Sequence, residues 1–147
     1  YEWARKVVDT WSSKVDKHNA KAIAKFGHAT IDFHQGEFEK VVGILSQMKF
    51  SNFHYRYRSR WLLFKAQYEI NKDYVEVIRV QLDNFRRLIT SNETRINKSI
   101  YEGIKTSIRI LSMLINRESL SIIENYYNQS NHVFERKWIL KKIKKPK

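Results

Sequence analysis

Apolar side chains recur along this chain at the spacing of one face of an α-helix, and this periodicity constrains the fold more than any other feature. In the stretch FHYRYRSRWLLFKAQY, residues 53–68, the residues Tyr57, Trp61, Phe64 and Tyr68 fall at positions i, i+4, i+7 and i+11. Residues at that spacing lie on one side of a helix, so we predict that these rings face a core. A surface on which nucleic-acid bases stack is the alternative. The same spacing recurs in Ala22, Phe26, Ala29 and Phe33 and in Ile104, Ile108, Leu111 and Ile115.

Turn-forming residues are scarce, since the 147 residues include only four Gly and one Pro. A β-rich domain needs more of both, so we predict an all-α domain. Each stripe is followed by a short break and a second striped helix, and the breaks are HQGEF (34–38), NKDY (71–74) and NRESL (116–120). Phe38, Tyr74 and Leu120 stand at the start of the second helices. Their separations of about 36 and 46 residues are typical of helical-hairpin repeats.

The predicted organisation is a single helical-repeat domain over residues 1–147. A leading helix at 1–12 precedes helix pairs at 14–50, 53–91 and 95–130, and a capping helix follows at 131–145. The chain opens with YEWARKVVDTW, which is typical of the middle of a helix, so we expect a fragment of a longer chain. The last helix has one apolar and one basic face, as a terminal cap requires, and Pro146 marks its end.

The segment IDFHQGEFEKVVGIL, residues 31–45, carries a more specific pattern. Gly36 precedes Phe38 by two positions, and Val41 follows Phe38 after three. This arrangement resembles the turn and second helix of a tetratricopeptide repeat. The segment WLLFKAQYEINKDYVEVI, residues 61–78, resembles that family more closely. Its large residues stand where the family has its Trp, Leu, Tyr and later aromatic, and they are Trp61, Phe64, Tyr68 and Tyr74.

The third unit resembles the family less closely, and its equivalent apolar residues are Leu114, Leu120 and Ile123. The repeats are degenerate, because the glycine of the turn is kept only as Gly36 and is replaced by Lys72 and Glu118. The resemblance covers residues from about 20 to about 130. The pattern is also similar to the C-terminal part of uncharacterised repeat proteins of Bacteroidetes-type bacteria.

The resemblance implies a short right-handed solenoid of antiparallel helix pairs, whose first helices form a concave groove for a protein or peptide. It places Thr30, Ala66 and Ser112 at one equivalent position facing the groove, where small side chains leave room for a ligand. We therefore expect a protein- or peptide-binding scaffold. The neighbouring groove positions are Phe26, Ser59, Leu62 and Ile108.

The formal net charge of +13 is high for a chain of this size. A basic chain attracts nucleic acid, an anionic membrane or an acidic protein, whereas charge on solvated helix faces serves only solubility. A nucleic-acid-binding repeat domain is therefore the alternative function, and the amphipathic last helix has the pattern of one that lies on a membrane. The candidate basic surface comprises Arg56, Arg58 and Arg60, and Lys141, Lys142, Lys144 and Lys145.

Residues that support catalysis or cofactor binding are few. The chain has no Cys, which excludes a disulfide and a cysteine-ligated zinc site. His28 and Asp32 are four residues apart and His34 is nearby, but one helix places the two histidines on different faces. We expect them to be hydrogen-bonded near a repeat interface and to bind no metal. No phosphate-binding glycine loop or nucleophile motif occurs, so we expect neither an enzyme nor a cofactor.

The N-terminal helix carries an apolar stripe of Trp3, Val7 and Trp11. We expect an exposed surface that contacts either a preceding repeat of a longer protein or a second copy of the chain in a homodimer. No apolar run reaches the roughly 18 residues of a membrane-spanning helix. The compartment stays open, with a slight preference for the cytoplasm.

Overall fold

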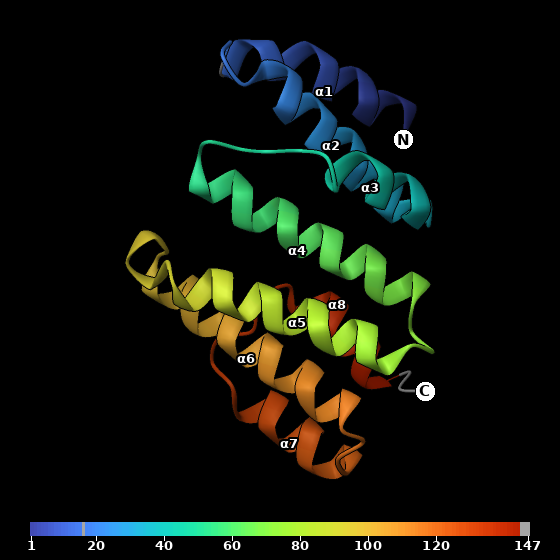
Figure 1. Cartoon of the computed structure of the whole chain (residues 1–147), viewed down its shortest axis with the longest axis vertical. Coiled ribbons are helices and arrows are strands. Elements are labelled where there is room, and N and C mark those ends of the chain that lie inside the picture. The colour runs from blue at the N-terminus through green and yellow to red at the C-terminus, as the bar shows by residue number, and fades with distance from the viewer. Residues whose placement is uncertain (16, 145–147) are drawn as a thin grey trace. The chain divides into compact units, whose positions relative to one another are not determined.

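The computed structural model describes residues 1–15 and 17–144, and these residues form helices and no strand (Figure 1). The predicted all-α fold class is thereby confirmed. The described residues form eight α-helices and one short 3-10 helix. They are α1 (Glu2–Val15), α2 (Ala20–His34), α3 (Phe38–Leu45), α4 (Phe53–Ile70), α5 (Val75–Thr90), the 3-10 helix η1 (Glu93–Arg95), α6 (Lys98–Ile115), α7 (Leu120–Gln129) and α8 (Arg136–Lys144).

The chain forms two compact units, one over Tyr1–Tyr74 and one that begins at Val75. The helix pair predicted at 53–91 therefore contributes α4 to the first unit and α5 to the second. The other predicted pairs, 14–50 and 95–130, each lie within one unit as α2 with α3 and α6 with α7. The leading helix, predicted at 1–12, continues to Val15.

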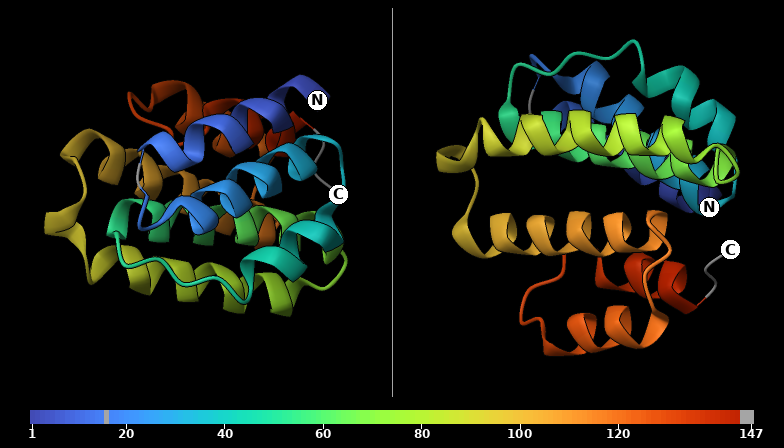
Figure 2. Two further views of the ribbon diagram at one scale, coloured as in Figure 1. Left: turned by 90° about the horizontal axis from the view of Figure 1, so that it is seen from above. Right: turned by 60° about the horizontal axis from the view of Figure 1, so that its bottom comes forward.

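In the first unit, consecutive helices pack on one another and run back and forth (Figures 1 and 2). α1 contacts α2, α2 contacts α3, α3 contacts α4, and α4 also reaches back to α2. The buried side chains between these helices include Ala29, Val41 and Leu45. This packing places α1 at the edge of the unit, with α2 as its neighbour.

The aromatic stripe of α4 lies in the core, as predicted. Tyr57, Trp61 and Phe64 are at most 2% exposed, and Tyr68 is half-buried. The Trp61 and Phe64 rings stack with their centroids 5.4 Å apart. The helix begins where Asn52 caps it, since the Asn52 side chain accepts a hydrogen bond of 2.8 Å from the backbone N–H of His54. These rings are therefore not available for stacking on nucleic-acid bases.

α2 and α6 end in the same way. Just beyond each helix one residue takes a left-handed φ, Gly36 at 80° and Arg117 at 55°. The N–H of the next residue then donates to a carbonyl five residues earlier, as in a Schellman motif. Arg117, and not Glu118, thus stands at the turn glycine's place in the third repeat. The sequence alignment is off by one here because the link 116–119 is one residue longer than the link 35–37.

In the second unit α6 is the central helix, and α5, α7 and α8 all contact it (Figure 2). Ile104, Ile110 and Leu111 on α6 are completely buried. The Asn97 side chain caps α6 by accepting a hydrogen bond of 3.0 Å from the Ser99 N–H. Only one narrow side of α6 is left open to solvent, and that side carries the candidate site.

The last helix begins at Arg136, later than the predicted start at 131. Its apolar residues Trp138, Ile139 and Ile143 are buried, and α8 contacts both α6 and α7. The apolar face of α8 is thus covered by the chain itself, and only its basic face is open to solvent. The predicted end of the capping helix, with Lys145 and Pro146, lies outside the described residues.

The segment before α8 lies close against the backbone of α6. The Phe134 N–H donates a hydrogen bond of 3.0 Å to the Gly103 carbonyl, and the Ser107 hydroxyl donates one of 2.8 Å to the Phe134 carbonyl. A Cβ at Gly103 would lie 3.2 Å from the Phe134 nitrogen. The absence of a side chain at Gly103 therefore allows this close approach.

Candidate functional site

Most of the predicted groove residues are buried or half-buried. Ser59, Leu62 and Ala66 on α4 are buried. Phe26 and Thr30 on α2 are half-buried, and the Thr30 hydroxyl donates to the Phe26 carbonyl at 2.9 Å. Ile108 and Ser112, the two predicted residues on α6, do line a cavity.

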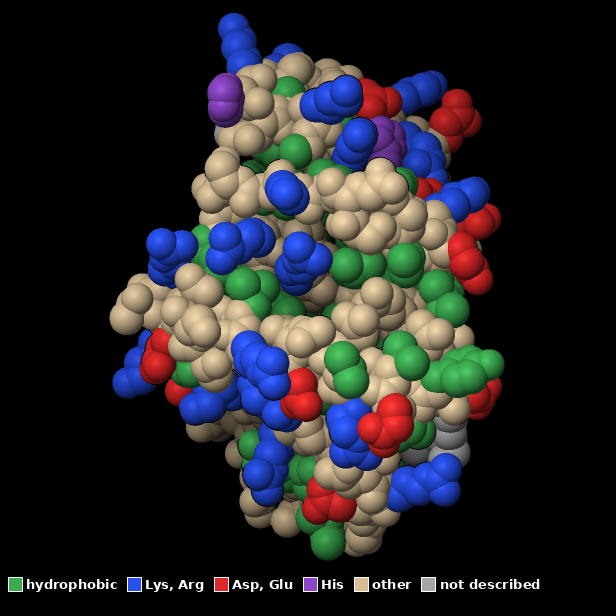
Figure 3. All heavy atoms as spheres, in the orientation of Figure 1, with side chains coloured by type: hydrophobic (Ala, Val, Ile, Leu, Met, Phe, Trp, Pro, Cys, Tyr) green, Lys and Arg blue, Asp and Glu red, His purple; other side chains and the backbone are tan. Residues whose placement is uncertain are grey.

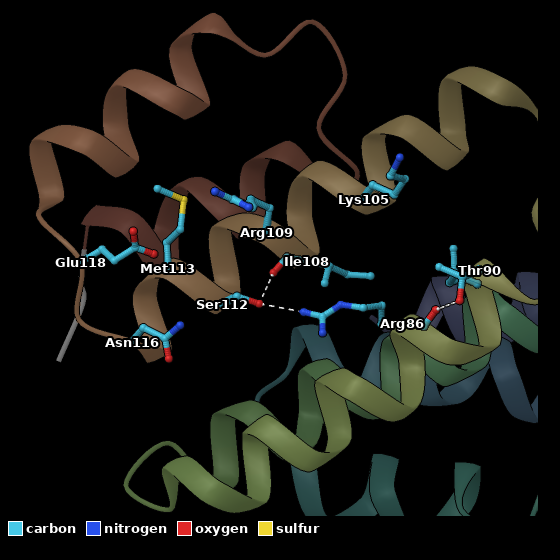
Figure 4. Close-up of a pocket in the computed structure, with 10 residues that line it drawn as sticks. Arg86, Thr90, Lys105, Ile108, Arg109, Ser112, Met113, Asn116 and Glu118 are labelled. Carbon is cyan, nitrogen blue, oxygen red and sulfur yellow. Dashed lines mark hydrogen bonds between the residues drawn. The ribbon is translucent and has the colours of Figure 1, made fainter.

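This cavity lies between α5 and α6, entirely within the second unit (Figure 4). Its volume of about 420 Å³ is within the usual range for ligand pockets. We call it the α5–α6 groove. It is lined by Arg86, Ile89, Thr90, Lys105, Ile108, Arg109, Ser112, Met113, Asn116 and Glu118.

The α6 wall of the groove is a polar strip at helical spacing. Lys105, Arg109, Ser112 and Asn116 follow one another at i, i+4, i+7 and i+11, each one position after a residue of the apolar stripe. The apolar stripe faces the core, since Ile104, Ile108 and Leu111 are buried. The polar strip beside it therefore faces the groove. The polar strip could therefore have been found in the sequence, because its residues recur at the same helical spacing as the buried apolar residues.

Two arginines of α5 reach across to this strip. Arg86 donates a hydrogen bond of 3.0 Å to the Ser112 hydroxyl and pairs with Asp83 at 2.6 Å (Figure 4). Seven residues earlier, Arg79 donates a hydrogen bond of 2.8 Å to the Asn116 side chain. These two bonds tie α5 to α6 at two points and fix the position of the Arg86 guanidinium at the groove.

The other two cations of the groove are less constrained. Lys105 lies 3.9 Å from Glu102 and has its ammonium 5.4 Å from the centre of the Tyr101 ring. Arg109 is exposed and makes no hydrogen bond or ion pair with any residue that the structure describes. The Arg109 guanidinium therefore has all its donors available to a ligand. Sequence reasoning missed Arg86, Lys105 and Arg109 because charge runs elsewhere in the chain drew more weight.

The predicted basic surface on α4 is only partly open. The Arg56 guanidinium lies 5.1 Å from the centre of the Phe53 ring, Arg58 lies 5.7 Å from that of Tyr57, and Arg60 is exposed. Desolvation and, secondarily, the Arg58 charge lower the pKa of His54 below its ordinary value. His54 is therefore more often neutral than an unperturbed histidine and adds less positive charge there.

On α8 the basic residues form an outer face over a buried apolar one. Lys141 and Lys144 are exposed, while the Lys142 ammonium lies 5.3 Å from the centre of the Trp138 ring. Lys145 lies outside the residues that the structure describes. Figure 3 shows that Lys and Arg side chains are distributed over much of one face of the molecule, with Asp and Glu between them. Spread charge of this kind serves solubility as well as binding.

His28 belongs to a polar network between α1 and α2. Its Nε2 lies 2.7 Å from Asp9, and its Nδ1 lies 3.3 Å from the Arg5 guanidinium. Arg5 also pairs with the buried Asp32 at 2.6 Å and donates to Gln35 at 2.8 Å. His28 is therefore hydrogen-bonded where α1 and α2 meet, and the prediction that this contact is a repeat interface stays a prediction. Among the described residues, no group of three His, Cys, Asp or Glu is placed to hold a metal ion.

The N-terminal stripe is exposed, as expected. Trp3 is 76% and Trp11 55% exposed, and Val7 is half-buried. The Lys14 ammonium lies 4.6 Å from the centre of the Trp11 ring. Within residues 1–15 and 17–144, none of the helices is both long and apolar enough to cross a membrane.

Comparison with protein-family models, with curated proteins and with solved structures finds no match to this chain.

Proposed function

We propose that this chain is a helical-repeat module that binds a protein or peptide and carries out no catalysis. In this proposal the helix pairs stack as a short right-handed solenoid, as the resemblance to tetratricopeptide repeats implies. The order of packing within each unit supports it, since consecutive helices contact one another from α1 to α4 and from α5 to α7.

The observation that carries the proposal is the α5–α6 groove. α6 is buried around most of its circumference, and its one open side borders a cavity lined mainly by polar side chains, with almost fully buried apolar residues at its floor. A concave site with a few converging polar groups is typical of a binding site, where those groups fix the orientation of a ligand. Ile108 and Ser112 both line it, although the resemblance places its groove along the first helices alone and this cavity lies between the second helix α5 and the first helix α6.

Selection of peptides from a displayed random library, with the wild-type chain as bait, tests this function. The groove is blocked in Ser112→Phe, and Ser121→Phe on the exposed side of α7 is the matched control. We expect selected peptides to bind the wild type and the control at moderate salt, and to lose about tenfold or more in affinity for Ser112→Phe. Equal binding to all three proteins would reject the groove as the binding site.

A nucleic-acid-binding module is the second candidate, and the net charge of +13 favours it. Against it, the aromatic residues beside the arginines of α4 and the lysines of α8 are largely buried in the core, so the basic segments offer few rings for bases to stack on. Titration of salt against binding to mixed-sequence single- and double-stranded nucleic acid distinguishes the two. Tight binding at low salt that falls steeply as salt rises would favour this second function.

A further inference from the structure

The α5–α6 groove has a strong excess of positive charge. Arg86, Lys105 and Arg109 line it, and Glu118 is the one carboxylate among its lining residues. Arg86 has Asp83 as its partner and Lys105 has a weak partner in Glu102, but Arg109 has none among the described residues. A ligand that fills the groove would therefore gain most from carrying negative charge opposite Arg109 and Lys105.

The lining of the groove favours a peptide over a nucleic acid. Ile89, Ile108 and Met113 lie beneath the cations but are only 1–4% exposed, so they offer a ligand little apolar surface. No aromatic ring is among the lining residues, so a base would have nothing to stack on. Glu118 at one end would repel a continuous phosphate backbone, whereas a peptide can present a neutral residue there.

The spacing along α6 matches an extended chain. Lys105 and Arg109 are four residues apart, a rise of about 6 Å along a helix. Alternate side chains of an extended peptide point the same way and are separated by about 6.6 Å. Two acidic residues at i and i+2 can thus face Lys105 and Arg109 together. The residue between them then points away from α6.

We propose that the α5–α6 groove binds an extended, internal peptide segment with acidic residues at alternate positions. The acidic side chains pair with Lys105 and Arg109, which lie four residues apart on α6. The strip from Lys105 to Asn116 is about 16 Å long, which accommodates about five extended residues. This inference rests on the proposed peptide-binding function and adds the chemistry of the partner.

Fluorescence anisotropy with peptides blocked at both ends tests the proposal, since blocked ends leave recognition to the side chains. The probe is Glu-Leu-Glu-Leu-Glu between short Gly-Ser flanks. Its controls are the same composition in the order Glu-Glu-Glu-Leu-Leu and the neutral Gln-Leu-Gln-Leu-Gln. We expect the alternating acidic probe to bind at least about fivefold more tightly than either control, because only it satisfies both the charge and the register.

Matched substitutions then locate the binding. Arg109→Gln should weaken the alternating acidic probe by about tenfold, since it removes a charged donor that has no other partner. Lys137→Gln removes one exposed cation from α8, outside the groove, and should change affinity by less than about twofold. Glu118→Gln should tighten binding by about twofold, because it removes the repelling carboxylate.

Several results would overturn the proposal. Equal affinity for the scrambled acidic peptide, or equal losses from Arg109→Gln and Lys137→Gln, would mean that binding depends on overall charge and not on the positions of the acidic residues. Tighter binding of an oligonucleotide, weakened by Arg109→Gln, would make the groove a nucleic-acid site. If neutral library peptides bind and Ser112→Phe blocks them, peptide binding stands and only the acidic pattern is rejected. If no peptide of any kind binds, both the peptide-binding function and the acidic pattern of its partner are rejected.

Discussion

The first and last helices of the described chain look alike in sequence but differ in what covers them. Both α1 and α8 carry tryptophan on one face and cations on another. On α8 the tryptophan side is buried, with Trp138 only 8% exposed. On α1 the tryptophan side faces solvent, with Trp3 76% exposed. An amphipathic pattern therefore identifies a face that suits burial and does not say whether the chain itself covers it.

The two helices are also attached by different interactions. α8 is held by apolar burial, and its preceding segment is held by backbone contact at Gly103. α1 packs on α2 through a side other than the one that carries its tryptophans. There Arg5 pairs with the buried Asp32, and Val8 packs on Gly27. This attachment leaves the side with Trp3 and Trp11 exposed to solvent. The comparison predicts that tryptophan substitutions reduce stability strongly at α8 and hardly at all at α1.

The largest expected effect is at α8. Trp138→Ala should lower the free energy of unfolding by about 3–5 kcal/mol, because it removes a large buried aromatic side chain. Trp3→Ala, the matched change on α1, should alter it by about 0.5 kcal/mol or less, as at an ordinary surface site. Urea denaturation followed by circular dichroism measures both. Similar losses from the two changes would mean that the tryptophan side of α1 is covered in solution.

The glycine contacts should give the next largest effects. Gly27→Ala should destabilise the chain by about 1–3 kcal/mol, because the new Cβ would lie 2.7 Å from the Val8 side chain. Val8→Ala in the same chain should recover part of that loss by clearing the space. Gly43→Ala is the control of opposite sign, since nothing lies within 4 Å of a Cβ there. It should stabilise the chain by about 0.5–1 kcal/mol through helix propensity. Failure of Val8→Ala to rescue would contradict the close packing of α1 on α2.

A smaller loss is expected from the polar attachment of α1. Asp32→Asn removes the charge that pairs with Arg5 at 2.6 Å and should cost about 1–2 kcal/mol, since Asp32 is buried but Arg5 is partly solvated. Hydrogen exchange should then increase in α1 and leave α8 unchanged. Glu2→Gln, which loosens only the exposed contact with Lys6 at 3.6 Å, is the control and should have almost no effect.

Much of the fold was predictable because local periodicity and packing agree. The stripe through Trp61 defined α4 and its buried side, and the break at Gly36 marked the end of α2 at a residue with φ of 80°. The division between the units at Tyr74 was not predictable. NKDY is a short polar break like the other two, and a hairpin break and a unit boundary differ only in long-range contacts.

The candidate site was only half predictable, for a related reason. Ile108 and Ser112 were identified because the repeat resemblance assigns positions along one helix. Arg86 was missed because it reaches the groove from α5 across to Ser112, and no spacing in the sequence encodes that approach. The other five predicted residues, Phe26, Thr30, Ser59, Leu62 and Ala66, carry small or apolar side chains that suit a core as well as a groove. Composition alone does not separate the two.

Substitutions on the exposed side of α1 should change stability least, but they should decide whether two copies of the chain associate. Trp3 and Trp11 together expose about 300 Å² of apolar surface per chain, using about 250 Å² for a whole tryptophan. Two copies would thus bury about 600 Å² through these rings, less than the roughly 1,200 Å² of a stable interface. We therefore expect any homodimer through α1 to be weak and to form only at high concentration.

Sedimentation should show concentration-dependent association of the wild type, which Trp3→Glu abolishes without changing the urea midpoint. Lys137→Glu, an equal charge reversal away from α1, should leave it intact. A wild type that stays monomeric at every concentration would reject the homodimer and leave this side of α1 for a different chain segment or partner.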